Sequence, residues 1–324
     1  MKQGNKEGHA MKKCPWHSGT NSAISYHIKK DFKMNYSLYF LILPVIIYYL
    51  AFCYVPILGN IIAFKDYIPK RGIIKSEWIG FRNFVDFFKN PGFMLVLKNT
   101  LNISISTIVV GFPAPIILAL LINEIKSVKF ARIVQTVSYL PHFISMVVVC
   151  GLISGFVGYR GIITDLVVFF GGQRTNLLGE PNLFVPIYVI SDIWQGIGWG
   201  SIIYLAALTA IDQQLYEAAT IDGAGKWRQL IHITIPGILP TMTIMLILRL
   251  GSVMAVGFEK IILLYNPLTY VTADVISTFV YRIGILDRNY SFASAVGLFN
   301  SLVNGLMLIL SNYFIKRISG EGIW

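Results

Sequence analysis

The chain has 324 residues, of which 55% are hydrophobic and 13% are charged, and its mean hydropathy is +0.64. These values exclude an ordinary soluble domain and are typical of a polytopic membrane protein whose main contact is membrane lipid. The formal net charge of +11 does not indicate nucleic-acid binding, because the excess lies in the amino-terminal region and in short loops, where the positive-inside rule places it.

The amino-terminal region, residues 1–36, is polar and basic and has no regular hydrophobic period. It does not read as a signal peptide, since the apolar run that follows is too long and no small-residue cleavage site comes after it. We therefore predict a cytoplasmic tail. The uncharged run at 34–64 is long enough for a first membrane span, with Pro44 and Pro56 as kink or end positions.

Two further spans are predicted in the first half of the chain, at 99–123 and 133–159. Both contain prolines, which a membrane helix accommodates when its neighbours bind the freed backbone groups. Residues 65–98 mix charged and aromatic side chains, which predicts an amphipathic helix at the membrane surface. The apolar piece at 166–170 is too short to cross a bilayer and is predicted to be interfacial.

The second half of the chain adds three spans, at 183–211, 236–257 and 291–314. A long polar and aromatic connection at 259–290 separates the last two. The sequence therefore predicts an all-α polytopic membrane protein with six transmembrane helices.

Two ionisable residues lie inside predicted spans, Asp192 in the fourth and Arg249 in the fifth. An ionisable group in lipid costs about 2.5 to 3.5 kcal/mol on insertion scales, so each needs a partner or a water-filled path. One interpretation is structural: they pair with each other or with the partner subunit. The other is a path for a sugar, held by aromatic faces and hydrogen bonds. The candidate path residues are Asp192, Trp194, Gln195, Trp199, Arg249, Asn300 and Asn304.

Between the fourth and fifth spans lies a polar, helix-forming segment. Leu215, Ala218 and Ala219 share one helical face, and Trp227, Leu230 and Ile231 repeat the spacing. Gly223-Ala224-Gly225 separates the two halves. Because glycine ends helices, the pattern predicts a helix, a sharp turn and a second short helix, with Pro236 opening the next span.

This segment resembles the EAA loop of ABC-importer permease subunits, in which Glu-Ala-Ala is followed by a glycine at the seventh position and by a hydrophobic-x-hydrophobic-Pro ending. The matching residues are Glu217, Ala218, Ala219, Gly223, Ile233 and Pro236, and Ile235 replaces the usual leucine. The resemblance implies the type I ABC importer permease fold. It places a transmembrane permease domain at 37–315, a coupling loop at 212–236 and a cytoplasmic tail at 316–324.

In that family the coupling loop sits in a groove of a separate ATPase subunit. The resemblance implies coupling roles for Glu217, Ala218, Ala219, Asp222, Gly223, Trp227 and Pro236, with Glu217 as an ionic latch and Trp227 as an interface anchor. It also implies a second permease subunit, an ATPase dimer that carries ATP and Mg, and an extracytoplasmic solute-binding protein. The numbers of lysines and arginines in the loops favour a cytoplasmic amino terminus by only a narrow margin. The resemblance implies a bacterial inner-membrane protein with both termini cytoplasmic.

A second run, residues 256–281, resembles the outer loop after the fifth span in the permease branch that imports polysaccharides and complex oligosaccharides. Within this branch the chain is most similar to the first permease subunits of bacterial alginate importers, which implies alginate or its oligosaccharides as cargo. The alternatives are an ABC permease for another cargo, such as peptide or metal, a self-sufficient secondary transporter, and a membrane glycosyltransferase. Inverted repeats and acidic catalytic pairs, which the last two would show, are not found.

Motifs for catalysis are absent from the sequence. It has no Gly-rich phosphate loop with Lys and Ser/Thr, so we expect no ATP binding by this chain. Its five histidines lack metal-ligand spacing, and its three cysteines predict neither a metal site nor a disulfide. We expect a noncatalytic subunit without a cofactor or metal of its own.

Overall fold

The computed structural model describes residues 33–320 and 322–323, so the predicted amino-terminal tail lies almost entirely outside the described residues. The chain divides into two units, Met1–Gly59 and Asn60–Trp324. In the first unit, α2 (Tyr36–Tyr49), η1 (Leu50–Tyr54) and α3 (Val55–Gly59) follow one another without a break. None of their residues is buried, as expected for an apolar helix whose surroundings are lipid.

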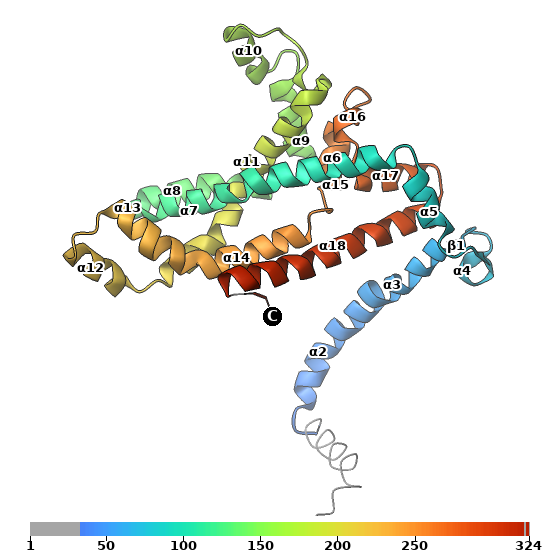
Figure 1. Ribbon diagram of the computed structural model, residues 1–324, viewed down its shortest axis with the longest axis horizontal. Coiled ribbons are helices and arrows are strands. Elements are labelled where there is room, and N and C mark those ends of the chain that lie inside the picture. The colour runs from blue at the N-terminus through green and yellow to red at the C-terminus, as the bar shows by residue number, and fades with distance from the viewer. Residues whose placement is uncertain (1–32, 321, 324) are drawn as a thin grey trace, which may run out of the picture. The chain divides into compact units, whose positions relative to one another are not determined.

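The second unit is a bundle of helices with one small strand pair (Figure 1). Its amino-terminal elements are η2 (Asn60–Phe64), β1 (Lys65–Asp66), α4 (Gly72–Lys75), β2 (Glu77–Trp78), α5 (Arg82–Lys89), α6 (Phe93–Ser106), η3 (Thr107–Gly111), α7 (Pro113–Asn123), α8 (Val128–Tyr139), η4 (Leu140–Phe143), α9 (Met146–Val157), α10 (Ile162–Phe169) and η5 (Leu177–Gly179). Then come α11 (Pro181–Thr209), α12 (Gln213–Ile221), α13 (Lys226–Gln229), η6 (Leu230–Thr234), α14 (Ile235–Gly251), α15 (Phe258–Leu264), α16 (Tyr270–Ala273), α17 (Ile276–Tyr281), η7 (Arg282–Leu286) and α18 (Tyr290–Ser319).

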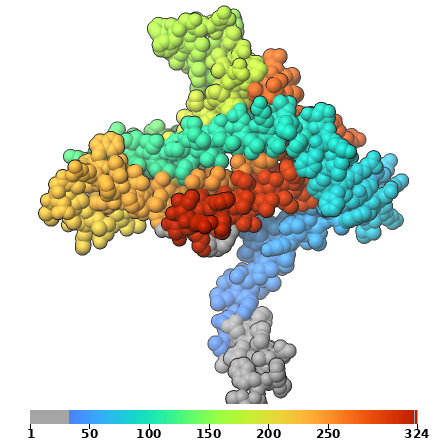
Figure 2. Space-filling model, viewed as in Figure 1, coloured from blue at the N-terminus to red at the C-terminus, as the bar shows by residue number. Residues whose placement is uncertain are grey.

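The described residues contain five helices that are long and apolar enough to cross a membrane, and six when α11 and α12, bent by 67°, are counted as one span. This agrees with the prediction of an all-α protein with six spans. Within the second unit, α12 and α13 lie at one end, and α5 and α17 lie at the other (Figures 1 and 2).

Several predicted boundaries were wrong. The second span begins at Phe93 rather than at residue 99, so Lys98 lies inside its helix. The predicted third span is broken, because Pro141 lies in the short turn η4, which ends α8, and Ile144 then takes an extended conformation. The piece at 166–170 is no isolated interfacial segment, since α10 follows α9 to complete a span-length stretch at Met146–Phe169.

Three wide π-helical turns, η1, η3 and η6, each lie just before a proline: Pro56, Pro113 and Pro236. A proline has no backbone N–H, and its ring clashes with the carbonyl four residues earlier. A π turn relieves this clash without ending the helix. The chain thus keeps long helical spans despite its prolines.

The long α11 is the element around which α7, α8 and α14 pack, and α14 in turn packs on α18. Its contact with α8 depends on Gly198. A Cβ at this position would lie 2.1 Å from the carbonyl oxygen of Ser138, which is far inside van der Waals contact. The two backbones can approach this closely only because residue 198 is glycine.

The connection at 259–290 is not a surface loop. It folds into α15, α16, α17 and η7, and it supplies buried apolar residues to two of the three core clusters. Ile261 joins residues of α9 and α11, and Ile276 joins Phe87 of α5. The predicted surface segment at 65–98 is likewise partly built into the core, since Phe87 is fully buried.

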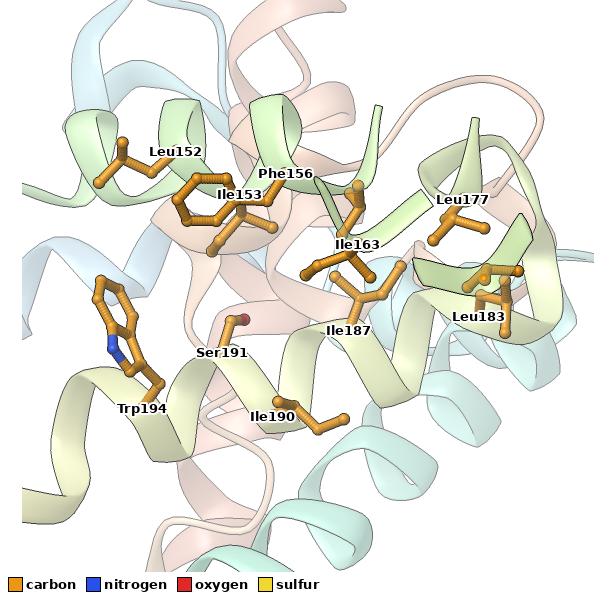
Figure 3. A pocket seen from close by; sticks show the side chains of 12 residues that line it. Leu152, Ile153, Phe156, Ile163, Leu177, Leu183, Ile187, Ile190, Ser191 and Trp194 are labelled. Atoms are coloured by element: carbon orange, nitrogen blue, oxygen red, sulfur yellow. The ribbon is translucent and has the colours of Figure 1, made fainter. Parts of the chain in front are cut away.

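An apolar cavity of about 470 Å³ lies between α9, α10, η5 and α11 (Figure 3). Leu152 and Phe156 of α9 face Ile187 and Ile190 of α11 across it. Apart from the Ser191 hydroxyl and the indole nitrogen of Trp194, its lining side chains are hydrocarbon. The cavity therefore offers almost no hydrogen-bonding groups.

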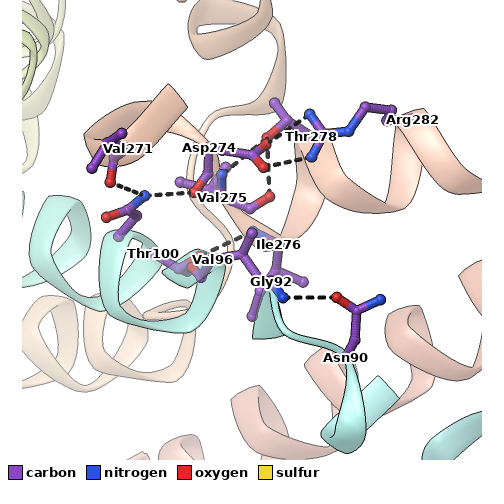
Figure 4. A network of polar contacts seen from close by, with 11 residues as sticks. Asn90, Gly92, Val96, Thr100, Val271, Asp274, Val275, Ile276, Thr278 and Arg282 are labelled. Atoms are coloured by element: carbon purple, nitrogen blue, oxygen red, sulfur yellow. Dashed lines mark hydrogen bonds and ion pairs between the residues drawn. The ribbon is translucent and has the colours of Figure 1, made fainter. Parts of the chain in front are cut away.

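A polar network ties the folded connection to α6 (Figure 4). Asp274 accepts hydrogen bonds from Arg282, at 2.5 and 3.3 Å, and from the Thr278 hydroxyl at 2.8 Å. The Asn99 amide donates to the Asp274 carbonyl at 3.0 Å, and the Thr100 hydroxyl oxygen accepts from the backbone of Ile276 at 3.0 Å. Since the Asp274 side chain is only 7% exposed, it depends on these partners for compensation of its charge.

We predict that Asp274→Asn lowers the melting temperature of the purified protein by about 5 °C or more, because breaking a largely buried ion pair costs about 3 kcal/mol. Thermal unfolding followed by intrinsic fluorescence measures the change. The control is Asp86→Asn, which removes a carboxylate from an exposed pair with Arg82 at 3.9 Å and should shift the melting temperature by about 1 °C or less. Equal shifts for both variants would refute a structural role for the buried pair.

Candidate functional site

The segment after α11 forms a helical hairpin, which we define as residues 212–229. Asp212 caps α12 by accepting a hydrogen bond from the backbone of Gln214 at 2.9 Å. Asp222 ends α12, and Gly223 follows with φ +76°, a left-handed conformation that favours glycine. Helix α13 then begins at Lys226. The predicted sequence of helix, glycine turn and short helix is confirmed.

Side chains brace the hairpin from inside. The Gln229 amide, which is buried, donates to the Thr220 hydroxyl at 3.0 Å and to the Ala224 carbonyl at 3.1 Å. Tyr216 and Thr234 share a hydrogen bond of 2.9 Å between their hydroxyls. These bonds tie α12 to the 224–234 segment, including η6, which runs directly into α14.

The outer surface of the hairpin carries large apolar side chains, although most residues of the segment are polar. Ile221 is 86% exposed and Trp227 is 77% exposed, and Ala218 and Asp222 are also exposed. Exposed large apolar side chains at the tip of a braced element are typical of a protein interface. Pro236 lies beyond the hairpin, in the first turn of α14.

A groove of about 860 Å³ runs between the hairpin and the loop at 123–126. Glu217 and Tyr216 line it from α12, whereas Glu124 and Lys126 line it from the loop. An ion pair of 3.1 Å between Glu124 and Lys226 closes one side. Glu217 is exposed and makes no ion pair among the described residues, so its carboxylate is available to a partner.

Inside the bundle, Asp192 of α11 lies between two cations. Its carboxylate is 3.8 Å from the Arg249 guanidinium and 3.6 Å from the Lys260 ammonium. Among the alternatives that the sequence left open for Asp192 and Arg249 was a pair with each other, and the structure brings them together. It also adds Lys260, which was not predicted as a site residue.

The Lys260 side chain is 1% exposed and is held by three contacts. Besides Asp192, its ammonium donates to the Tyr188 carbonyl at 3.3 Å and lies 4.8 Å from the centroid of the Tyr188 ring. Burial lowers the pKa of Lys260, and the negative charge of Asp192 opposes this. A carboxylate, a carbonyl and a ring face all favour the ammonium form, because none of them donates a hydrogen bond.

Two cavities, of about 220 and 200 Å³, share Asp192 and Arg249 in their linings; the first has a mainly polar wall and the second a mainly apolar one. The first is lined also by Ser104, Thr107 and Ser252, and the second by residues of α7, α11 and α14. Hydroxyls, a carboxylate and a guanidinium around a cavity can hydrogen-bond a polar ligand. Among the described residues no group of three or more His, Cys, Asp or Glu could hold a metal ion.

The other predicted path residues do not gather at these cavities. Trp194 lines the apolar cavity of Figure 3, and Trp199 stacks on the His142 ring at 4.6 Å. Asn304 accepts a hydrogen bond from the Met254 backbone at 2.9 Å, where the chain leaves α14. Asn300 has a buried oxygen without a partner among the described residues, and Gln195 is half-buried on α11.

Sequence reasoning missed Lys260 because it was assigned to a polar outer connection. A signal was present, since Lys260 is followed by the apolar run Ile261–Leu264 in a short helix. A lone cation in such a run predicts a buried partner. What the sequence could not indicate was that the partner would be Asp192 on a helix far away along the chain.

This part of the chain matches a known protein family. The family model described as "Binding-protein-dependent transport system inner membrane component" matches residues 111–320, which include the hairpin and the Asp192 cluster. The chain is 44% identical over 288 residues to the polygalacturonan/rhamnogalacturonan transport system permease protein YteP of Bacillus subtilis, covering 89% of this chain and 90% of that protein.

The arabinooligosaccharides transport system permease protein AraP of the same organism is 24% identical over 86% of this chain and 88% of its own length. Among solved structures, a bacterial alginate ABC transporter in complex with an alginate pentasaccharide-bound periplasmic protein contains a similar chain. The two are 43% identical with a TM-score of 0.83, over 91% of this chain and 99% of that one. The protein described here therefore belongs to the family of binding-protein-dependent inner membrane transport components, the permease subunits of ABC transporters.

Proposed function

We propose that the chain is a permease subunit of an ATP-driven importer for oligo- or polysaccharides and that residues 212–236 couple it to a separate ATPase. The observation that carries the proposal is the braced hairpin, with its apolar tip and its free carboxylate at Glu217. A transporter powered from outside the bilayer needs such a rigid projection to convert closure of the ATPase into movement of helices.

The contacts with the ATPase would be made by residues on the surface of the hairpin. Glu217 would pair with a basic group of the ATPase, and Ala218, Ala219 and Gly223 would allow a close approach of its backbone. Trp227 would fill a pocket on the ATPase. Asp222 and Pro236 would set the shape of the coupling segment, since Asp222 ends α12 and Pro236 lies in the first turn of the following span. ATP and Mg would be bound by the ATPase dimer.

Cargo is proposed from the relatives. Two proteins with 43 to 44% identity to this chain are named for polygalacturonan/rhamnogalacturonan and for alginate, which are acidic polysaccharides. We propose alginate or its oligosaccharides as cargo. A second permease subunit and an extracytoplasmic solute-binding protein would complete the assembly, and the solute-binding protein would dock at the end of the second unit that carries α5 and α17.

The proposed orientation puts the hairpin and both termini in the cytoplasm of a bacterial inner membrane. The permease domain would be 37–315, although α18 continues to Ser319 into the proposed carboxyl-terminal tail at 316–324. The loop at 123–126, which lies beside the hairpin, would face the same side.

We predict that Glu217→Lys weakens the affinity for the ATPase by about tenfold or more, because it replaces an attractive interfacial charge with a repulsive one. Co-purification from membranes that contain the whole assembly, followed by titration with purified ATPase, measures the change. The control, Glu77→Lys, makes the same charge change at an exposed residue in the segment at 65–98 and should leave the affinity unchanged. Unaltered binding by the Glu217 variant would rule out the latch.

Orientation is tested with two isoleucines of nearly equal exposure, Ile74 at 92% and Ile221 at 86%. In a background without native cysteines, we expect a membrane-impermeant thiol reagent to label Ile74→Cys in cells whose outer membrane is opened or absent. Ile221→Cys should react only after the inner membrane is permeabilised. Labelling of Ile221→Cys from outside would place the hairpin on the wrong side for an ATPase.

A further inference from the structure

The charges at the centre of the bundle do not balance. Asp192 contributes one negative charge, whereas Arg249 and Lys260 contribute one positive charge each. Glu259 is exposed and lines neither of the two cavities, so it does not restore the balance. A cluster inside a membrane protein is left with one positive charge in excess, which is costly unless an anion approaches it.

Of the two cations, Arg249 is the one whose charge is less compensated by the protein. Lys260 is fully enclosed, lies slightly closer to Asp192 than Arg249 does, at 3.6 against 3.8 Å, and has two further favourable contacts with Tyr188. The Arg249 side chain is 48% exposed, and its ion pair with Asp192 at 3.8 Å is too long for a hydrogen bond. Among the described residues, its guanidinium donates no hydrogen bond, and its one ion pair is that with Asp192.

Arg249 is also placed where a ligand can reach it. Of the described residues that line the two cavities, it is the only base, and Asp192 is the only acid. The guanidinium therefore presents its donors to both spaces, with serine and threonine hydroxyls on the walls of the larger one.

We propose that Arg249 is a specificity-determining residue which binds a carboxylate of the saccharide in transit, so that this permease favours acidic over neutral saccharides. The proposal rests on the proposed function and assigns a substrate class to its path. A guanidinium suits the task because it stays charged and its planar donors match a carboxylate in pairs.

Asp192 gives the site a means of release. Transport requires binding that is strong enough to admit the cargo and weak enough to let it leave. A carboxylate held 3.8 Å from Arg249 competes with the cargo for the same guanidinium and repels the cargo's negative charge. Lys260 holds that competitor in position, which makes it a positioning residue for the site.

The test compares a negatively charged cargo with a neutral cargo of the same size. Proteoliposomes containing the complete assembly and its solute-binding protein take up labelled alginate trisaccharide or its fully methyl-esterified form, and initial rates are measured. The solute-binding protein is identical in all samples. The change in the acid-to-ester rate ratio between wild type and variant therefore reports on the permease alone.

We expect Arg249→Gln to lower the acid-to-ester ratio by about tenfold or more, mainly through the acid, while Arg249→Lys retains most of the ratio because it keeps the charge. The matched control is Arg174→Gln, at an exposed arginine that already pairs with Asp165 at 2.6 Å and should leave the ratio unchanged. A second variant, Ser252→Asp, leaves Arg249 in place but adds a carboxylate to the same cavity wall, and it should lower the ratio as well.

The outcomes separate the two proposals. If wild-type proteoliposomes take up neither trisaccharide, the proposed function with this cargo fails. If they take up the acid but Arg249→Gln keeps the wild-type ratio, or lowers both rates equally, the inference is overturned and Arg249 has a structural role only. If Arg249→Gln does not assemble, Ser252→Asp decides, and an unchanged ratio in that variant overturns the inference.

Discussion

The structure depends on one constraint, which is that polar groups inside an apolar bundle must find their partners within the protein. A carboxylate or a freed carbonyl that is withdrawn from water there loses hydrogen bonds, which the protein must replace. Asp192 is accordingly held between Arg249 and Lys260, and Asp274 is held by Arg282 and Thr278. The same constraint explains why three of the prolines, Pro56, Pro113 and Pro236, are preceded by π turns that keep the helices continuous instead of ending them.

The hairpin and the charged cluster differ in how they meet this constraint. The hairpin satisfies its buried Gln229 amide internally, is tied to η6 by the Tyr216–Thr234 bond, and leaves apolar side chains exposed for a partner. The cluster leaves a charge unmatched beside a cavity. Both connect to α14, which begins next to the hairpin and carries Arg249 in its last turn. A movement of the hairpin would therefore be transmitted along one helix to the candidate cargo site.

Much of the fold could be predicted because uncharged runs of about 20 residues have few alternatives to crossing a membrane. The hairpin was located because Gly223 marks its turn and Pro236 marks the start of the span that follows it. The break at Pro141 and the folding of 259–290 were not predicted, since both depend on contacts with distant helices. Lys260 was missed for the same reason: the sequence shows a lysine in a short apolar helix, but only packing brings it to Asp192.

The central claim is that this chain moves saccharide only as part of an assembly driven by a separate ATPase. The most direct test is ATP-dependent accumulation of labelled alginate oligosaccharide in proteoliposomes, with the subunits and the solute-binding protein omitted one at a time. The account predicts accumulation only when this chain, the second permease, the ATPase and the solute-binding protein are all present. Accumulation by this chain alone, driven by an ion gradient and indifferent to ATP, would contradict it.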